Sequence, residues 1–87
     1  MLNKRREQYM RNFNNAVKLA LLSIDETYID FCKEINYKHQ EFSDKINLYK
    51  RCFTVDEMIW LAEYLELGSV NDICKGGGGN GKNNIDQ

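Results

Sequence analysis

The chain contains no proline, and five of its six glycines lie at positions 76–81. Proline and glycine interrupt helices more than any other residues, so the preceding sequence can form helices with few breaks. The same stretch has no convincing alternation of apolar and polar residues, which is the pattern of a half-buried strand. With 43% apolar residues, 87 residues can bury one small core. We therefore predict an all-α domain followed by a flexible Gly/Asn-rich tail.

Five helical stretches are predicted from the spacing of apolar residues and from capping patterns. The first begins near Tyr9, with apolar residues at steps of three and four from Met10 to Ile24. The others lie near 28–35, 38–47, 55–67 and 70–74. Capping boxes are expected at Ser23-Ile24-Asp25-Glu26, with Thr27 as a second possible cap, and at Thr54-Val55-Asp56-Glu57. Asn36 is expected to close a helix in a left-handed conformation, and Gly68 another. These elements divide the chain into a basic, frayed arm (1–8), a helical domain (9–75) and a disordered tail (76–87).

Charge is distributed unevenly along the chain, although the formal net charge is only −1. Residues 1–51 hold ten Lys/Arg and seven Asp/Glu, whereas residues 52–87 hold two and six. A basic front and an acidic back suit a protein that turns one face towards a polyanion, although ordinary scatter gives such a difference about as often.

Enzymatic and metal-dependent functions find no candidate site in the sequence. Cys32, Cys52 and Cys74 form no CxxC pair, and the only histidine, His39, does not have the spacing of a zinc site. The run from Gly76 to Lys82 fits G-x-x-x-x-G-K but lacks the strand and the Ser/Thr of a phosphate-binding loop. We expect no enzyme activity, no cofactor and no metal. Without a signal peptide or an apolar span, a cytoplasmic location is expected.

The segment from Asn15 to Cys74 resembles the Cro/repressor-type (XRE-like) helix-turn-helix family of phage and bacterial transcription regulators. The resemblance rests on Phe42-Ser43-Asp44-Lys45-Ile46-Asn47, on Phe53-Thr54-Val55-Asp56-Glu57-Met58 and on Leu61-Ala62-Glu63-Tyr64-Leu65. It implies a compact five-helix, lambda-repressor-like domain that binds an operator as a dimer and represses by occupying it. Two positions depart from the family pattern, because Asn36 and Leu48 stand where glycine is common. Glu41 and Asp44 would also repel phosphates from the presumed recognition helix.

A helix over 38–47 that turns Phe42 and Ile46 inward would present its polar residues outward. Base contacts are expected from Lys38, His39, Gln40, Ser43 and Asp44. Phosphate contacts are expected from Arg5, Arg6, Tyr28, Lys45, Asn47, Lys50 and Arg51, with the arm along the backbone or in a minor groove. The dimer contacts expected from the C-terminal helices are Tyr64, Leu67, Val70 and Ile73.

A second hypothesis keeps the same scaffold but gives it a protein partner. Overall acidity, together with Glu41 and Asp44 on the presented helix, would suit an antirepressor, an inhibitor of a host enzyme or an antitoxin-like subunit. A continuous positive band through Lys38, Lys45, Lys50 and Arg51 would favour DNA, and a broken band beside an exposed apolar patch would favour protein.

Overall fold

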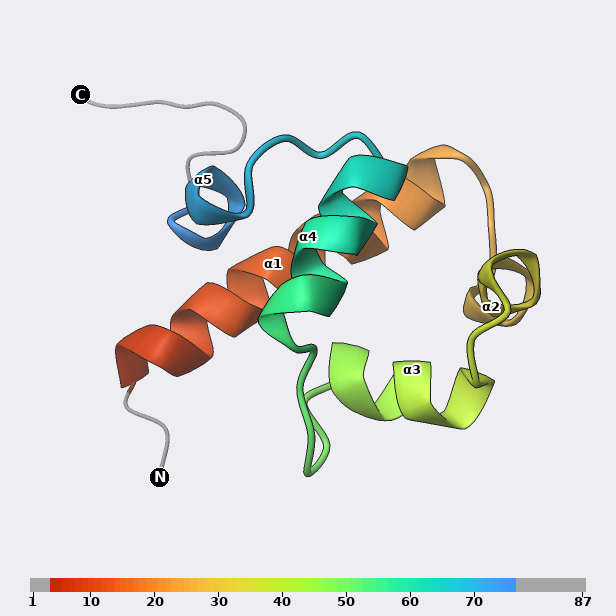
Figure 1. The fold of residues 1–87 in the computed structure, drawn as a ribbon, viewed down its shortest axis with the longest axis horizontal. Coiled ribbons are helices and arrows are strands. Elements are labelled where there is room, and N and C mark those ends of the chain that lie inside the picture. Colours follow the sequence, from red (N-terminus) through yellow and green to blue (C-terminus); the bar gives the residue numbers. More distant parts are fainter. Residues whose placement is uncertain (1–3, 77–87) are drawn as a thin grey trace.

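The computed structural model describes residues 4–76, and this part of the chain contains five helices and no strand (Figure 1). The helices are α1 (Lys4–Ser23), α2 (Tyr28–Ile35), α3 (His39–Ile46), α4 (Val55–Tyr64) and α5 (Val70–Cys74). The predicted all-α class and its five helices are confirmed. Residues 1–3 of the expected arm and 77–87 of the expected tail lie outside the described residues.

The first helix is longer than the sequence analysis predicted. It begins at Lys4 and not near Tyr9, so residues 4–8 form its first turns and are not a frayed arm. The prediction followed the apolar stripe alone, although lysine, arginine, glutamate and glutamine are themselves good helix formers. Glu7 and Arg11 also form an ion pair across one turn of this helix, which favours a helical start.

Side chains cap the starts of α2, α4 and α5. The Thr27 hydroxyl accepts the Asp30 amide at the start of α2, whereas the Ser23 hydroxyl donates to the Ala20 carbonyl, so Thr27 and not Ser23 is the cap. Thr54 and Glu57 form the predicted capping box of α4, and Ser69 caps α5. These local hydrogen bonds satisfy amides that a helix start leaves without partners.

Each of the first four helices is followed, one or two residues after its end, by a residue with a left-handed backbone, and none of these residues is glycine. They are Asp25, Asn36, Leu48 and Glu66, with φ between 56° and 58°. The amide of the next residue bonds a carbonyl five positions back, as from Tyr37 to Cys32 at 2.8 Å. The prediction for Asn36 is confirmed. That for Gly68 is wrong, because α4 already ends at Tyr64 and Glu66 makes the left-handed turn.

The core lies where α1, α4 and the α2–α3 pair meet, and phenylalanine rings fill it. Phe13, Phe31 and Phe42 have no exposed surface, and Phe53 is 3% exposed. The Phe42 ring is within 5.8 Å of the Phe31, Phe53 and Tyr28 rings, measured between centroids. Burial of each such ring stabilises the fold by about 2–3 kcal/mol, because its apolar surface is removed from water.

Two asparagines of α1 attach the other helices to it. The buried Asn14 donates to the carbonyls of Lys45 and Ile46 at 3.1 Å, which fixes the C-terminal end of α3. Asn12 donates to the Cys74 carbonyl at 2.7 Å and fixes the end of α5. Both bonds satisfy carbonyls that helix ends leave without partners, so α1 is the element against which α3 and α5 are placed.

Candidate nucleic-acid interface

The α2–α3 pair is joined by three residues, Asn36 to Lys38. The left-handed Asn36 turns the chain, and Lys38 occupies the N-cap position of α3 in an extended conformation. The Tyr37 ring packs edge-on against the Phe42 ring at 6.0 Å, so the turn is held by the core of the following helix. The pair is therefore connected tightly enough to hold α3 in one orientation.

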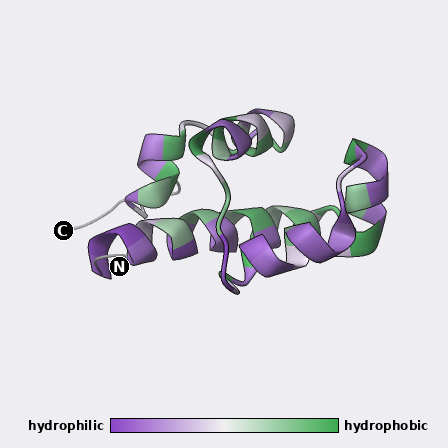
Figure 2. Ribbon diagram, turned by 60° about the horizontal axis from the view of Figure 1, so that its bottom comes forward, coloured by the Kyte–Doolittle hydropathy of each residue, from purple (hydrophilic) through white to green (hydrophobic). Residues whose placement is uncertain are grey.

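One face of α3 is anchored and the other is open to solvent. Phe42 and Ile46 are 0% and 2% exposed, whereas His39, Gln40 and Asn47 are exposed and Ser43 and Asp44 are partly exposed. Figure 2, which turns the bottom of Figure 1 forward, shows α3 coloured largely as hydrophilic. The outward set expected for base contacts, Lys38, His39, Gln40, Ser43 and Asp44, thus lies together at and along one helix.

The two acidic residues of α3 both have partners. Asp44 accepts a hydrogen bond from the Gln40 amide at 3.0 Å, and its other oxygen lies 4.0 Å from Nε of Arg51. Glu41 accepts from Nζ of Lys45 at 2.8 Å, and these contacts lower the pKa of Glu41 below its ordinary value of 4.5. Their negative charges are therefore offset locally, which reduces the repulsion of a phosphate backbone.

Lys45 lies on the inner side of α3 and not on its outer face. It is 8% exposed, and its ammonium is 2.8–3.0 Å from Glu41, Glu57 and the Tyr37 hydroxyl. Burial alone would lower the pKa of Lys45, but hydrogen bonds to these three groups raise it well above its ordinary value. The three N–H donors of this ammonium already have partners, so Lys45 is not placed to contact a phosphate.

Lys45 belongs to a cluster with Tyr37, Glu41 and Glu57, in which the Glu57 carboxylate accepts several hydrogen bonds. This carboxylate accepts from the Tyr37 hydroxyl at 2.6 Å and from the Thr54 amide at 2.9 Å, besides Lys45. Burial would raise its pKa, but the hydrogen bonds from Tyr37, the Thr54 backbone and Lys45 together lower it below 4.5. Burial and the bond to Glu57 raise the pKa of Tyr37 to about 12. The sequence analysis gave no role to Tyr37, although its place directly after Asn36 puts it at the turn.

The other expected phosphate contacts are spread around the molecule. Lys50 and Arg51 are exposed in the loop after α3, and Nζ of Lys50 lies 5.3 Å from the Tyr49 ring centroid. Asn47 is exposed at the end of α3, where its amide donates to the Ser43 carbonyl. Tyr28 is half-buried, and burial raises its pKa. Arg5 and Arg6 lie in the first turns of α1, which Figure 1 places at the far end of the molecule from α2.

The four residues expected to form dimer contacts are mostly turned towards the core. Ile73 is 5% exposed, and Leu67 and Val70 are half-buried against core residues. Tyr64 is 44% exposed, but its ring stacks on Trp60 at 5.1 Å and its hydroxyl donates to Glu34. The set therefore forms no continuous exposed apolar patch, although Leu67 and Ile73 line a hollow beside α1.

Residues 4–76 contain no group of three or more His, Cys, Asp or Glu side chains that could hold a metal ion. Cys32 and Cys74 are buried free thiols, and burial raises the pKa of both. None of the helices in this range has the length and apolar character needed to cross a membrane. No family model, curated protein or solved structure matches the chain.

Proposed function

We propose that this protein is a sequence-specific double-stranded DNA-binding regulator in which α2 and α3 act as a helix-turn-helix and α3 enters the major groove. The observation that carries the proposal is the polarity of α3. Phe42 and Ile46 hold the helix to the core, while Lys38, His39, Gln40, Ser43 and Asp44 line its accessible side. A helix anchored along one side and polar along the other is what major-groove reading requires.

The hydrogen bond between Gln40 and Asp44 gives this surface a defined chemistry. It holds the Gln40 amide group on the outer face, where its oxygen and remaining N–H can pair with an adenine edge. Asp44 can accept from a cytosine amine while Arg51, at its other oxygen, keeps its charge compensated. Phosphates on one side of the groove would then be contacted by the residues that follow the C-terminal end of α3, which are Asn47, Lys50 and Arg51.

Occupation of an operator by a small repressor is the regulatory mode we infer. A DNA ligand selected from random duplexes would test the proposal. After selection, the binding constant for the selected duplex and for a scrambled one would be measured by fluorescence anisotropy across a salt series. We expect tighter binding of the selected duplex by at least about 10³-fold, the usual lower range for a specific site. Equal affinity for both duplexes, or no binding at low salt, would contradict the proposal.

A protein partner is the second candidate function, and the exposed apolar residues of α4 favour it. Val55 is 63% exposed, Ile59 44% and Trp60 43%. These residues lie on one helix, and tryptophan is enriched in protein interfaces. If α4 binds a protein, Trp60→Ala would abolish that binding while Gln40→Ala leaves it intact. A regulator that works only through DNA would show the reverse pattern in the duplex assay.

A further inference from the structure

The outer face of α1 carries two exposed leucines. Leu19 is 65% exposed and Leu22 is 73% exposed, whereas Phe13, Val17 and Leu21 on the opposite side of the helix are at most 1% exposed. A single exposed leucine is ordinary. Here two of them stand about one turn apart on the side of α1 that points away from the core, which makes α1 apolar on both faces over its second half.

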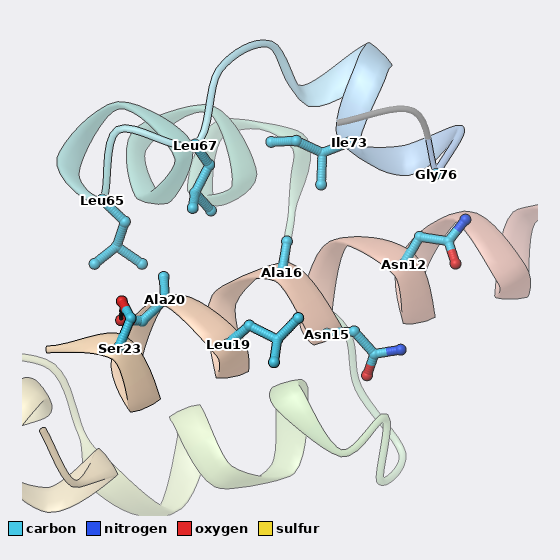
Figure 3. A pocket seen from close by; sticks show the side chains of 10 residues that line it. All are labelled: Asn12, Asn15, Ala16, Leu19, Ala20, Ser23, Leu65, Leu67, Ile73 and Gly76. Atoms are coloured by element: carbon cyan, nitrogen blue, oxygen red, sulfur yellow. Dashed lines mark hydrogen bonds between the residues drawn. The ribbon is translucent and has the colours of Figure 1, made fainter. Parts of the chain in front are cut away.

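A hollow lies on each side of this pair. The larger, about 570 Å³, has Ala16, Leu19 and Ala20 on its α1 side and Leu65, Leu67 and Ile73 opposite (Figure 3). In Figure 3 these three opposite side chains point towards Ala16 and Ala20, and the small alanines leave room between the two sides. The second hollow, about 470 Å³, lies beside Leu22 and is lined by Lys18, Leu21 and the segment 25–28. Leu19 and Leu22 thus form a ridge on the surface of the protein, with one hollow on each side of it.

Charge along α1 is polarised. Its N-terminal half holds four basic residues against Glu7, its second half holds only Lys18, and Asp25 and Glu26 follow its end; the four are Lys4, Arg5, Arg6 and Arg11. The pKa of Glu26 is raised, first by burial and then by repulsion from Glu34. A helix that is basic at its start and followed by acidic residues at its end is complementary to a second copy of itself in the antiparallel orientation.

We propose that this face of α1 is the contact between two copies of the chain, packed antiparallel so that Leu19 and Leu22 of each enter the hollows of the other. Arg11 of each copy then lies near Glu26 of its partner. The interface is isologous, because the same ridge and hollows serve both copies. An α1 helix of 20 residues is about 30 Å long. With Arg11 beside the partner's Glu26, only residues 14–23 of the two helices lie opposite each other, about half of that length. The interface is therefore at or below the small end of the range for specific dimers, so association is weak and depends on concentration.

This arrangement leaves both α3 helices on one side of the dimer, a step that rests on the proposed function. The end of α3 packs against Asn14, and a small hollow between α3 and α1 is lined by Lys18. At about 100° per residue, Lys18 and Asn14 lie roughly 100° and 140° around the helix from Leu19. A two-fold axis perpendicular to the plane of the two α1 helices does not move α3 across that plane. Two copies could therefore present α3 to one duplex.

The mass of the protein in solution tests the contact without DNA. Sedimentation equilibrium of the full chain, at concentrations up to about 1 mM, should give a mass that rises from 10.2 kDa towards twice that value. Leu19→Glu and Leu22→Glu should each weaken the dimer at least about tenfold, since each places a charge in an apolar contact. Val55→Glu is the matched control, because Val55 is 63% exposed on α4, outside both hollows, and should not change the mass.

Charge reversal tests the antiparallel orientation. Arg11→Glu and Glu26→Arg should each weaken association, and the double variant should recover part of it. A mass of 10.2 kDa at every concentration would overturn the proposal, as would a dimer that Val55→Glu disrupts and Leu19→Glu does not. A dimer that the reversals weaken without recovery would also overturn it. A dimer with these properties that fails to bind a duplex would refute the proposed function alone.

Discussion

The ammonium of Lys45 lies 2.9 Å from the carboxylate of Glu57 and joins the inner side of α3 to the first turn of α4. The side chain of Lys45 is 10% exposed and that of Glu57 is 25% exposed, so water screens this pair less than a surface ion pair. Glu41 and Tyr37 complete the cluster from α3 and from the turn before it. The orientation of α3 therefore depends on a lysine that points away from the surface we assign to DNA.

Replacement of Lys45 by methionine should destabilise the fold by about 2–3 kcal/mol, because Glu57 would keep a partly buried charge without its cation. Urea denaturation followed by circular dichroism measures this loss. Lys33→Met, an exposed lysine on α2, is the control and should change stability by less than about 0.5 kcal/mol. If the Lys45→Met protein keeps its stability and only the slope of log K for DNA against log salt becomes smaller by about one, Lys45 is instead a phosphate contact.

Stability should fall in acid through the same cluster. Glu57 has a folded pKa below its ordinary 4.5. A carboxylate of this kind contributes stability above its unfolded pKa and loses that contribution as the pH falls through its folded pKa. We expect the urea midpoint to be nearly constant from pH 7 to about 5 and to drop below about 4.5. In Glu57→Gln the drop should be shallower; an unchanged drop would place the acid sensitivity elsewhere.

Gln40→Ala should reduce discrimination at one base pair of the selected duplex by roughly 1–3 kcal/mol. The reason is that the alanine cannot form the paired hydrogen bonds to a base edge. Binding to a scrambled duplex should hardly change, since phosphate contacts dominate it. Competition anisotropy with single-base variants of the duplex measures both quantities. An equal loss on all duplexes would show that Gln40 contributes no base reading.

Lys50→Ala should weaken binding to every duplex by a similar factor and lower the slope of log K against log salt by about one, as expected for one lost phosphate contact. Its ammonium is in an exposed loop, so the fold should keep its stability. The salt series with selected and scrambled duplexes measures the slope. If Lys50→Ala and Gln40→Ala have indistinguishable effects, the assignment of separate base and phosphate roles is wrong.

Glu66→Gly should stabilise the protein by about 0.5–1 kcal/mol, because glycine adopts φ near +56° without the steric cost that a Cβ imposes. Glu63→Gly provides a matched control, since it removes the same charge three residues earlier inside α4 and should destabilise by about 1 kcal/mol. Thermal unfolding of the two variants side by side measures the difference. A loss of stability in both would mean that Glu66 has a stabilising contact that outweighs its backbone cost.

The features that the sequence predicted correctly depend on neighbouring residues. Thr54 and Glu57 satisfy each other's backbone amides within one turn, and Asn36 tolerates the left-handed turn by its own chemistry. The spacing of Phe42 and Ile46 likewise identified the inner face of α3, so the exposed polar set followed from helix geometry.

The features that the sequence missed depend on elements far apart in the chain. Lys45 is next to Ile46 on the helix and looked exposed by its residue type. Its burial depends on Glu57, twelve residues later, whose position is set by the packing of α4. The left-handed conformation of Glu66 was missed for a related reason. Glycine is the usual signal for such a position, and Gly68 lies only two residues away.

The reversals of direction at Asp25, Asn36, Leu48 and Glu66 have a consequence for how the molecule folds. Most of these residues avoid the left-handed conformation in a short peptide, so the tertiary contacts of the folded protein must stabilise it. Peptides that contain one helix and its following turn should therefore lose that turn in water. We therefore expect the four turns to form together in one cooperative folding transition, and not one helix at a time.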